Sequence, residues 1–198
     1  MKIDLCFRLQ GDTIPLDHAY PLFSALSDVI PELHEDREVG IHSIRGQAVD
    51  GRLKLTNRSI LALRVPEELR DRYSVLSGQS IWIDNASVDL VFFQARPLVP
   101  RANLFSPLVI IKGFTEPEPF RDAVQRQLTG NCIEGRAYLV PSKNQQYQFA
   151  RQVIRIHDKI VVGFAVELAM LSAEDSIRVQ EMGIGGRRHF GCGLFGGR

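Results

Sequence analysis

The first half of the chain alternates between apolar patterns typical of strands and of helices. Residues 3–9 are apolar at every second position, which predicts a half-buried strand. Apolar side chains between 16 and 30 then recur at helical spacing, with Asp17 able to cap the helix or sit in its first turn, and Pro31 stops it. The remaining predicted elements are strands at 40–49 and 53–65, a short helix from Pro66, and a last strand near 81–83 or 88–93. The predicted order is βαββαβ.

The second half repeats this order. Its predicted elements are a strand at 108–112, a helix at 117–128, strands at 136–140, 152–157 and 160–168, a helix that Ser172 opens and Gly183 closes, and a last strand at 192–195. Two such units predict an α+β fold of tandem ferredoxin-like domains, 1–96 and 108–198, joined by a proline-rich linker at 97–107. Helices cover one face of such a sheet, so we expect the other face to be free for binding, as in RNA-recognition modules.

Composition indicates a folded chain and leaves the partner open. The 198 residues are 44% apolar and 24% charged, which excludes a disordered or collagen-like chain. The net charge of +1 hides a split, because residues 1–99 carry 11 basic and 14 acidic side chains and residues 100–198 carry 13 and 9. Arginines outnumber lysines 19 to 5. Arginine suits bidentate phosphate contacts, although codon usage would produce the same bias.

The cysteines and the apolar runs indicate the compartment. Cys6, Cys132 and Cys192 are far apart, and no Cys/His cluster has zinc spacing, so we expect no disulfide framework, no metal site and no cofactor. The first residues are too charged for a signal peptide, and no run approaches the roughly 18–20 apolar residues of a membrane helix. The sequence predicts a cytoplasmic protein with no membrane partner.

The least random segment is the glycine-rich C-terminus, Gly183-Ile-Gly-Gly-Arg-Arg-His-Phe-Gly-Cys-Gly-Leu-Phe195. Glycines let a backbone approach a phosphate and turn its N–H groups inward, and the arginines add charge. The segment follows a predicted helix and lacks a Gly-Lys-Ser/Thr, so neither a dinucleotide-binding turn nor a P-loop fits. A flexible tail is the alternative, but the apolar residues of this segment can anchor it to a core.

The sequence resembles the CRISPR-associated repeat-processing endoribonucleases, which are tandem ferredoxin-like proteins of this size with a glycine-rich loop after the last helix. It looks closest to their MYXAN-type branch. The resemblance runs along most of the chain, and only the glycine-rich segment is diagnostic. The collinear pieces are the first strand, Asp17-His-Ala-Tyr20, Leu33-His-Glu35, Val39–Gly46, Ile110–Phe120, Ser172–Ser176 and Gly185–Arg188.

The resemblance implies cleavage of precursor CRISPR RNA within its repeats, without a metal ion. The ribose 2′-OH attacks the neighbouring phosphate and leaves a 2′,3′-cyclic phosphate and a 5′-OH. This chemistry needs a base for the 2′-OH proton, an acid for the leaving 5′ oxygen and a cation near the phosphate. Histidine suits both proton transfers because its unperturbed pKa lies near the operating pH.

The resemblance places His34 first among the candidate catalytic residues, since it follows the first helix in Leu-His-Glu. His42, in the expected second strand, comes second. Tyr20 is the candidate tyrosine of the first helix, although it lies on the apolar stripe. No lysine occurs between positions 2 and 54, so Arg37 or Arg45 has to steady the phosphate charge.

Two further histidines are interpreted as structural. His18 begins the first predicted helix, where a cap or a packing role is favoured, and His157 lies beside Asp158 in a turn context that favours the surface.

RNA contacts are expected from the second half. The hairpin-like stretch 141–150 could contact a repeat stem, with Tyr147 or Phe149 stacking on a base, although a solvated hairpin is the alternative. The candidate RNA-binding residues of this half are Lys143, Arg151, Arg155, Gly185, Gly186, Arg187, Arg188, His189, Gly191 and Gly193.

The expected partner is CRISPR repeat RNA, both precursor and mature guide, with effector-complex subunits as possible further partners. A non-catalytic RNA-binding subunit of such a complex is the main alternative function. A ferredoxin-like sensor that holds a ligand phosphate is the second alternative.

Overall fold

The computed structural model describes residues 1–143, 147–156 and 159–197. It divides into two compact units, Met1–Pro97 and Leu98–Arg198. This boundary lies within one residue of the predicted end of the first domain, and the first strand of the second unit already begins at Leu104, inside the stretch predicted as linker. His157, predicted to lie at the surface, is outside the described residues.

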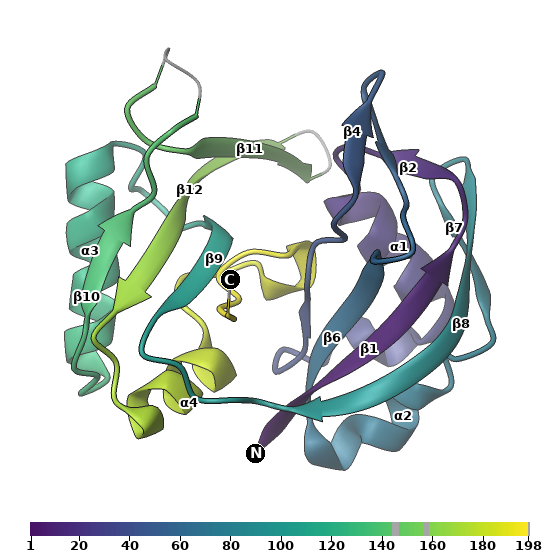
Figure 1. The fold of residues 1–198 in the computed structure, drawn as a ribbon, viewed down its shortest axis with the longest axis horizontal. Coiled ribbons are helices and arrows are strands. Elements are labelled where there is room, and N and C mark those ends of the chain that lie inside the picture. Colours follow the sequence, from purple (N-terminus) through teal and green to yellow (C-terminus); the bar gives the residue numbers. More distant parts are fainter. Residues whose placement is uncertain (144–146, 157–158, 198) are drawn as a thin grey trace. The chain divides into compact units, whose positions relative to one another are not determined.

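The first unit is a five-stranded antiparallel sheet with helices on one side (Figure 1). Its strand order is β3-β6-β1-β8-β7. The elements are β1 (Lys2–Gln10), β2 (Thr13–Pro15), α1 (Ala19–Val29), the 3-10 helix η1 (Pro31–His34), β3 (Gly40–Ile41), β4 (Gln47–Val49), β5 (Arg52–Lys54), β6 (Ile60–Pro66), η2 (Glu67–Leu69), α2 (Arg70–Ser74), β7 (Ser80–Ile83) and β8 (Ala86–Pro97). The order β3-β6-β1-β8 is that of a ferredoxin-like unit.

The two strands predicted at 40–49 and 53–65 are each divided in the structure. The stretch 47–54 leaves the main sheet as a hairpin, β4–β5, which pairs with β2 in a separate three-stranded sheet. Asp50 and Gly51 both have positive φ, at 49° and 74°, which is the geometry that a two-residue hairpin turn requires. The last strand was predicted near 81–83 or 88–93, and the structure has strands at both places, paired as the β7–β8 hairpin.

Helix α1 begins later than the sequence pattern predicts. Leu16, assigned to its apolar stripe, is 51% exposed and precedes the helix. His18 occupies the N-cap position and Asp17 lies before it, so the predicted role of Asp17 is wrong. The reason is that β2 takes up residues 13–15, which pair with β5 and keep the backbone extended.

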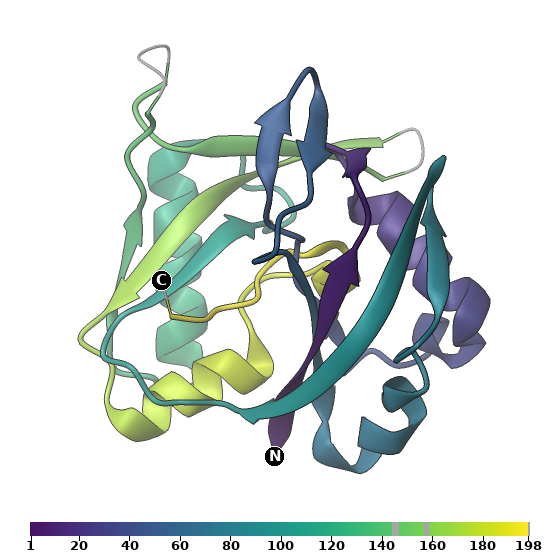
Figure 2. The same cartoon turned by 45° about the vertical axis from the view of Figure 1, so that its right-hand side comes forward.

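The second unit has a four-stranded sheet centred on β12 (Figure 2). Its elements are β9 (Leu104–Val109), α3 (Pro117–Gly130), β10 (Arg136–Leu139), β11 (Arg151–Ile156), β12 (Lys159–Ala169), α4 (Ala173–Met182) and the 3-10 helix η3 (Arg188–Phe190). β10 and β11 pair with successive parts of β12, and β9 also pairs with β12. Ser172 caps α4 by accepting a hydrogen bond from the Asp175 N–H, as predicted.

The predicted last strand at 192–195 is replaced by irregular backbone that lies along β9. Gly193 N–H donates to Leu108 O at 2.8 Å, and Phe105 and Gly196 exchange two backbone hydrogen bonds. The segment therefore occupies the place of the fourth ferredoxin strand without forming a regular one. Its glycines have positive φ at 185, 191 and 193, which interrupts extended geometry.

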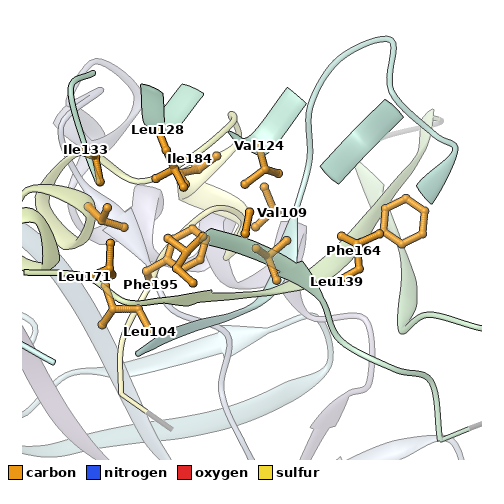
Figure 3. Close-up of a cluster of buried hydrophobic side chains, with 14 of the residues drawn as sticks. Leu104, Val109, Val124, Leu128, Ile133, Leu139, Phe164, Leu171, Ile184 and Phe195 are labelled. Atoms are coloured by element: carbon orange, nitrogen blue, oxygen red, sulfur yellow. The ribbon is translucent and has the colours of Figure 1, made fainter. Parts of the chain in front are cut away.

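The core of the second unit lies between the sheet and the helices (Figure 3). Val124 and Leu128 of α3 meet Phe164 of β12 and Val109 of β9 there. Ile184 and Phe195, on either side of the glycine-rich stretch, are 1% and 0% exposed in the same cluster. Burial of two large apolar side chains holds the C-terminal segment on the unit, so it is not a loose tail. No helix among the described residues is long and apolar enough to cross a membrane.

Candidate functional site

An ion pair between a buried arginine and a half-buried aspartate lies beside His42 in the first unit. Asp4 of β1 and Arg64 of β6 are directly opposite each other in the antiparallel register. Arg64 Nε and Nη2 donate to Asp4 Oδ1 and Oδ2 at 2.8 and 2.9 Å, a bidentate contact. His42 follows β3, its N–H donates to Ala62 O of β6, and its Nε2 lies 3.8 Å from Asp4 Oδ1. We call these three residues the Asp4 cluster.

The electrostatics of the Asp4 cluster favour an ionised carboxylate and a neutral imidazole. Burial raises the pKa of Asp4, but His42 and Arg64 lower it more, so that it lies well below its ordinary value. Burial lowers the pKa of His42, and Arg64 and Arg45 act in the same direction while Asp4 opposes them. Nε2 of His42 is buried and has no hydrogen-bond partner, since 3.8 Å is too long for one.

His34 lies elsewhere in the first unit, at the end of η1, and is exposed. Its ring meets Phe23 of α1 edge-on, with the ring centroids 5.0 Å apart and an interplanar angle of 85°. The contact orients an imidazole that solvent reaches. Tyr20, in the first turn of α1, is half-buried.

The segment that joins His34 to His42 is anchored at two points. Asp36 accepts a hydrogen bond from the Tyr73 hydroxyl at 2.6 Å and pairs with Arg72 at 3.0 Å. Lys2 Nζ contacts Glu38 twice, at the carboxylate (2.7 Å) and at the carbonyl (2.9 Å). These contacts hold the backbone that places both histidines.

The remaining predicted groups of the first unit differ in their surroundings. Arg37, between the two anchors of this segment, is exposed, and so is Arg45, which is near enough to His42 to lower its pKa. His18 is 7% exposed; its Nδ1 lies 3.2 Å from Pro15 O and from Leu16 O, and its Nε2 accepts from Ile44 N–H. Its two nitrogens are used internally, which makes it a packing residue.

The C-terminal segment of the second unit needs several of its glycines for close packing. Gly185 and Gly193 have φ of +74° and +69°, and a Cβ at either position would overlap a backbone carbonyl, that of Ile110 or of Ile184. Gly186 has open space around it instead. Two of the glycines are therefore explained by the fold alone.

The backbone N–H groups of this segment are directed inward. Gly185 N–H donates to Gln127 Oε1, Gly186 N–H to Ile110 O, and Gly191 N–H to Arg188 O. Gly193 N–H donates to Leu108 O, so the N–H groups of all four glycines predicted to bind RNA form hydrogen bonds within the protein. In this structure these N–H groups are therefore not available to cradle a phosphate, because β9 and the residue after it, α3 and η3 provide their acceptors.

Three polar side chains of the segment remain as candidate ligand groups. Arg187 is exposed and has the left-handed φ of 66°, which turns the chain into η3. Arg188 and His189 are half-buried, and the buried Nε of Arg188 has no hydrogen-bond partner. A buried guanidinium N–H without a hydrogen-bond acceptor costs free energy. A ligand that accepts a hydrogen bond from Arg188 Nε would remove this cost.

The C-terminal segment also covers part of the sheet face that was expected to be free. Leu108 and Ile110 alternate with Val109 and so face away from the helices. Cys192 forms a buried cluster with these two residues, and Phe190 and Ile154 pack against it. Burial raises the pKa of the Cys192 thiol to about 12. In this unit an RNA cannot use that part of the face in the manner of an RNA-recognition module.

The polar stretch after β10 was predicted to be a hairpin with basic neighbours. Its two ends are joined by the bridge between Pro141 and Phe149, and Ser142 N–H donates to Gln148 O; residues 144–146 lie outside the described part. Lys143, Arg151 and Arg155 are exposed.

Sequence reasoning missed Asp4 and Arg64. Both signals were present, because Asp4 stands on the polar side of an alternating strand, and Arg64 is a lone charge in the apolar run 60–66. A charge in such a run needs a partner when it is buried, but the sequence does not name the partner. In the part of the chain that the structure describes, no group of three His, Cys, Asp or Glu side chains could hold a metal ion.

Comparison with known proteins decides the family. The family model described as "Cas6 Crispr" matches residues 3–198. The chain belongs to the Cas6 family. The "CRISPR-associated endonuclease Cas6" of Myxococcus xanthus (strain DK1622) is 40% identical over 193 residues, which span 98% of this chain and 80% of that protein.

Solved structures share the fold of this Cas6 family member at low sequence identity. A "CRISPR associated protein Cas6" has a TM-score of 0.70 at 13% identity, with 98% of each chain covered. "An RAMP protein binding different RNA substrates" has 0.67 at 12%, and a protein from "a Cas6-related gene from Pyrococcus furiosus" has 0.66 at 15%, again with 98% of both chains covered. The tandem ferredoxin-like fold predicted from the sequence is confirmed.

Proposed function

We propose that this chain is an endoribonuclease that cleaves precursor CRISPR RNA within its repeats and keeps the product bound in an effector complex. Its relative from Myxococcus xanthus, 40% identical, is named an endonuclease. The observation that carries the proposal is His34, an exposed imidazole whose orientation the Phe23 ring sets. A proton acceptor must reach its substrate and be positioned for it; the exposure of His34 and its ring contact with Phe23 support this role.

The proposed reaction is a metal-independent transesterification. His34 takes the proton of a ribose 2′-OH, and the 2′ oxygen forms a bond to the adjacent phosphorus. The bond from phosphorus to the 5′ oxygen breaks, and that oxygen takes up a proton. The products are a 2′,3′-cyclic phosphate and a 5′-OH, so that no water is consumed in the cleavage.

The other candidate groups have supporting roles in this proposal. Burial lowers the pKa of His42, which favours its neutral form. Its Nε2 is buried, whereas His34 is exposed, and His42 is therefore ranked second. Tyr20 is the remaining candidate acid. Arg37 and Arg45 are exposed on either side of His42 in the sequence and would offset the charge that develops on the phosphate.

The proposed RNA-binding groups of the second unit are side chains rather than glycine N–H groups. Arg187 is exposed, and Arg188 has an unmet donor. The exposed Lys143, Arg151 and Arg155 would contact further phosphates of the repeat.

The test is a cleavage assay with end-labelled repeat RNA in the presence of EDTA. The 5′ fragment should end in a 2′,3′-cyclic phosphate. Its 3′ end then accepts a label only after the cyclic phosphate has been removed, and this result supports the proposal. Tight binding with intact RNA would instead assign the chain as a non-catalytic RNA-binding subunit. Cleavage that stops in EDTA would contradict the metal-independent mechanism.

A further inference from the structure

The side of the first unit's sheet that faces away from the helices carries exposed aromatic rings on β7 and β8, whereas Cys6 and Arg64 on the same side are only 7% and 2% exposed. On β1 and β8 the side chains that point toward the helices are buried, for example Phe7 and Leu90. Phe92 and Trp82 alternate with such residues and face the other way, and they are 63% and 65% exposed. We call the exposed part of this side, around Arg8, Phe92 and Trp82, the open face.

The register of the strands shows what surrounds Phe92. Ile60 of β6, Arg8 of β1 and Phe92 of β8 are cross-strand neighbours in one row of the open face. Side chains in such a row lie about 5 Å apart at Cβ, so the Arg8 side chain stands between two apolar ones. Arg8 is exposed, and Ile60 is 36% exposed.

Further polar groups continue the open face on both sides of Phe92. Gln94 and Arg96 follow at the next two outward positions of β8, and both are exposed. Trp82 of β7 is opposite Ser87 of β8, five residues from Phe92. At about 3.3 Å per residue the two rings are about 16 Å apart along the strand, too far for one base and suited to a strand of several nucleotides.

We propose that the open face of the first unit binds single-stranded RNA, with Phe92 and Trp82 stacking on bases and Arg8 and Arg96 contacting phosphates. Aromatic rings on an exposed sheet are the usual platform for unpaired bases, and stacking tolerates any base. This inference rests on the proposed function for its ligand, and it adds a second contact region, distinct from His34 and from the C-terminal segment.

The arrangement fits RNA better than a protein partner. Arg8 separates the Ile60 and Phe92 side chains, and Asp89 lies along β8 between Phe92 and the position opposite Trp82, so the apolar side chains of the open face are not gathered into one patch. The core of a stable protein interface is instead depleted of charge. Arg8 beside Phe92, and Arg96 four residues further along β8, offer phosphate contacts, and the rings offer a base contact, which are the two contacts that a nucleotide needs.

Trp82 gives a direct measurement, because it is the only tryptophan of the chain. We expect its fluorescence to be quenched on titration of the full chain with a 10-nucleotide single-stranded RNA of mixed sequence, and to change less with a blunt RNA duplex of equal length. This readout needs neither cleavage nor the repeat sequence. If this RNA quenches the Trp82 fluorescence but the chain does not cleave repeat RNA, the proposed function is contradicted and the inference about the open face is supported.

Two substitutions test the role of Phe92. Phe92→Ala should weaken binding of the same RNA about 5-fold or more, since a lost base stack has a measurable effect on affinity, and Phe92→Tyr should restore it. Val75→Ala is the matched control, because Val75 is 52% exposed and follows α2 on the helix side of the unit. Its affinity should equal that of the unsubstituted chain.

Two results would overturn the inference. One is RNA binding by the full chain with unchanged Trp82 fluorescence and with equal affinity for Phe92→Ala. The other is concentration-dependent dimerisation, seen by sedimentation without RNA and lost in Phe92→Ala, which would show that a second copy of the chain covers the open face.

Discussion

Asp4 and Arg64 are sixty residues apart in the sequence and face each other across β1 and β6, where the guanidinium of Arg64 contacts both carboxylate oxygens of Asp4. The Arg64 side chain is 2% exposed and that of Asp4 is 22% exposed. The pair also faces His42, whose Nε2 lies 3.8 Å from Asp4. One cross-strand contact thus stabilises the sheet and sets the electrostatics of a candidate histidine.

Removal of one partner of this pair should destabilise the first unit. Arg64→Met leaves the Asp4 carboxylate without its bidentate partner, and Asp4→Asn leaves a buried guanidinium without a counter-charge. We expect either change to lower the free energy of unfolding by about 3 kcal/mol, as for other buried pairs with one partner removed. Urea denaturation measures this. The double substitution should cost less than the sum of the two, and strict additivity would show that the residues do not interact.

The stability of the chain should fall as pH drops below about 6.5, in part because of His42. Its folded-state pKa is lowered, so the unfolded chain binds the proton more readily between the folded pKa and the unfolded value near 6.5. The neutral form contributes stability above that window, and the contribution is lost within it. His42→Gln should flatten the dependence between pH 7.5 and 5.5. Some slope should remain, because burial also lowers the pKa of His18.

His34→Ala should reduce the single-turnover cleavage rate at least about 100-fold, the usual effect of removing a general base. Affinity for repeat RNA should stay within about twofold, because His34 acts on a proton and not as an anchor. Glu35→Ala, a change at the next exposed position, is the control. Full activity of His34→Ala together with an inactive His42→Ala would transfer the catalytic role to His42.

Arg187→Gln should weaken RNA binding and reduce its salt dependence. Each lost phosphate contact lowers the slope of log K against log salt by about 0.7 to 0.9. Arg121→Gln serves as control, since Arg121 is a surface residue of α3 that pairs with Asp122 at 2.8 Å. Equal slopes for the two variants would remove Arg187 from the RNA-binding surface.

Two glycines of the same segment should respond differently to alanine. Gly193→Ala adds a Cβ that overlaps Ile184 O at a positive φ, and should cost about 2 kcal/mol or more of stability from backbone strain and the displaced segment. Gly186→Ala meets nothing within 4 Å and should change stability by less than about 0.5 kcal/mol. Thermal denaturation compares them. A Gly193→Ala chain as stable as Gly186→Ala would mean that the segment does not pack along β9.

Several parts of the candidate site could not be predicted from the sequence. His34 and His42 were identified as candidates, but their different surroundings were not, because exposure at the end of η1 and burial beside Asp4 depend on neighbours from other elements. The glycines were interpreted as phosphate ligands, whereas two of them serve close backbone packing. The sequence pattern predicts a helix-free face in the first unit, but which aromatic side chains lie on it depends on strand register.

The sequence by itself determined the tandem arrangement of the two units and the positions of most of their helices and strands, because alternation and helical spacing are local patterns that each segment carries alone. It also determined which residue types were available for proton transfer and for phosphate contacts. Only the tertiary structure decided that Arg64 is the partner of Asp4, and that residues 193–196 lie along β9, where Gly193 and Gly196 donate their N–H groups. These relationships join positions sixty and more residues apart. They depend on strand register and on the space left by other elements, which no local pattern records.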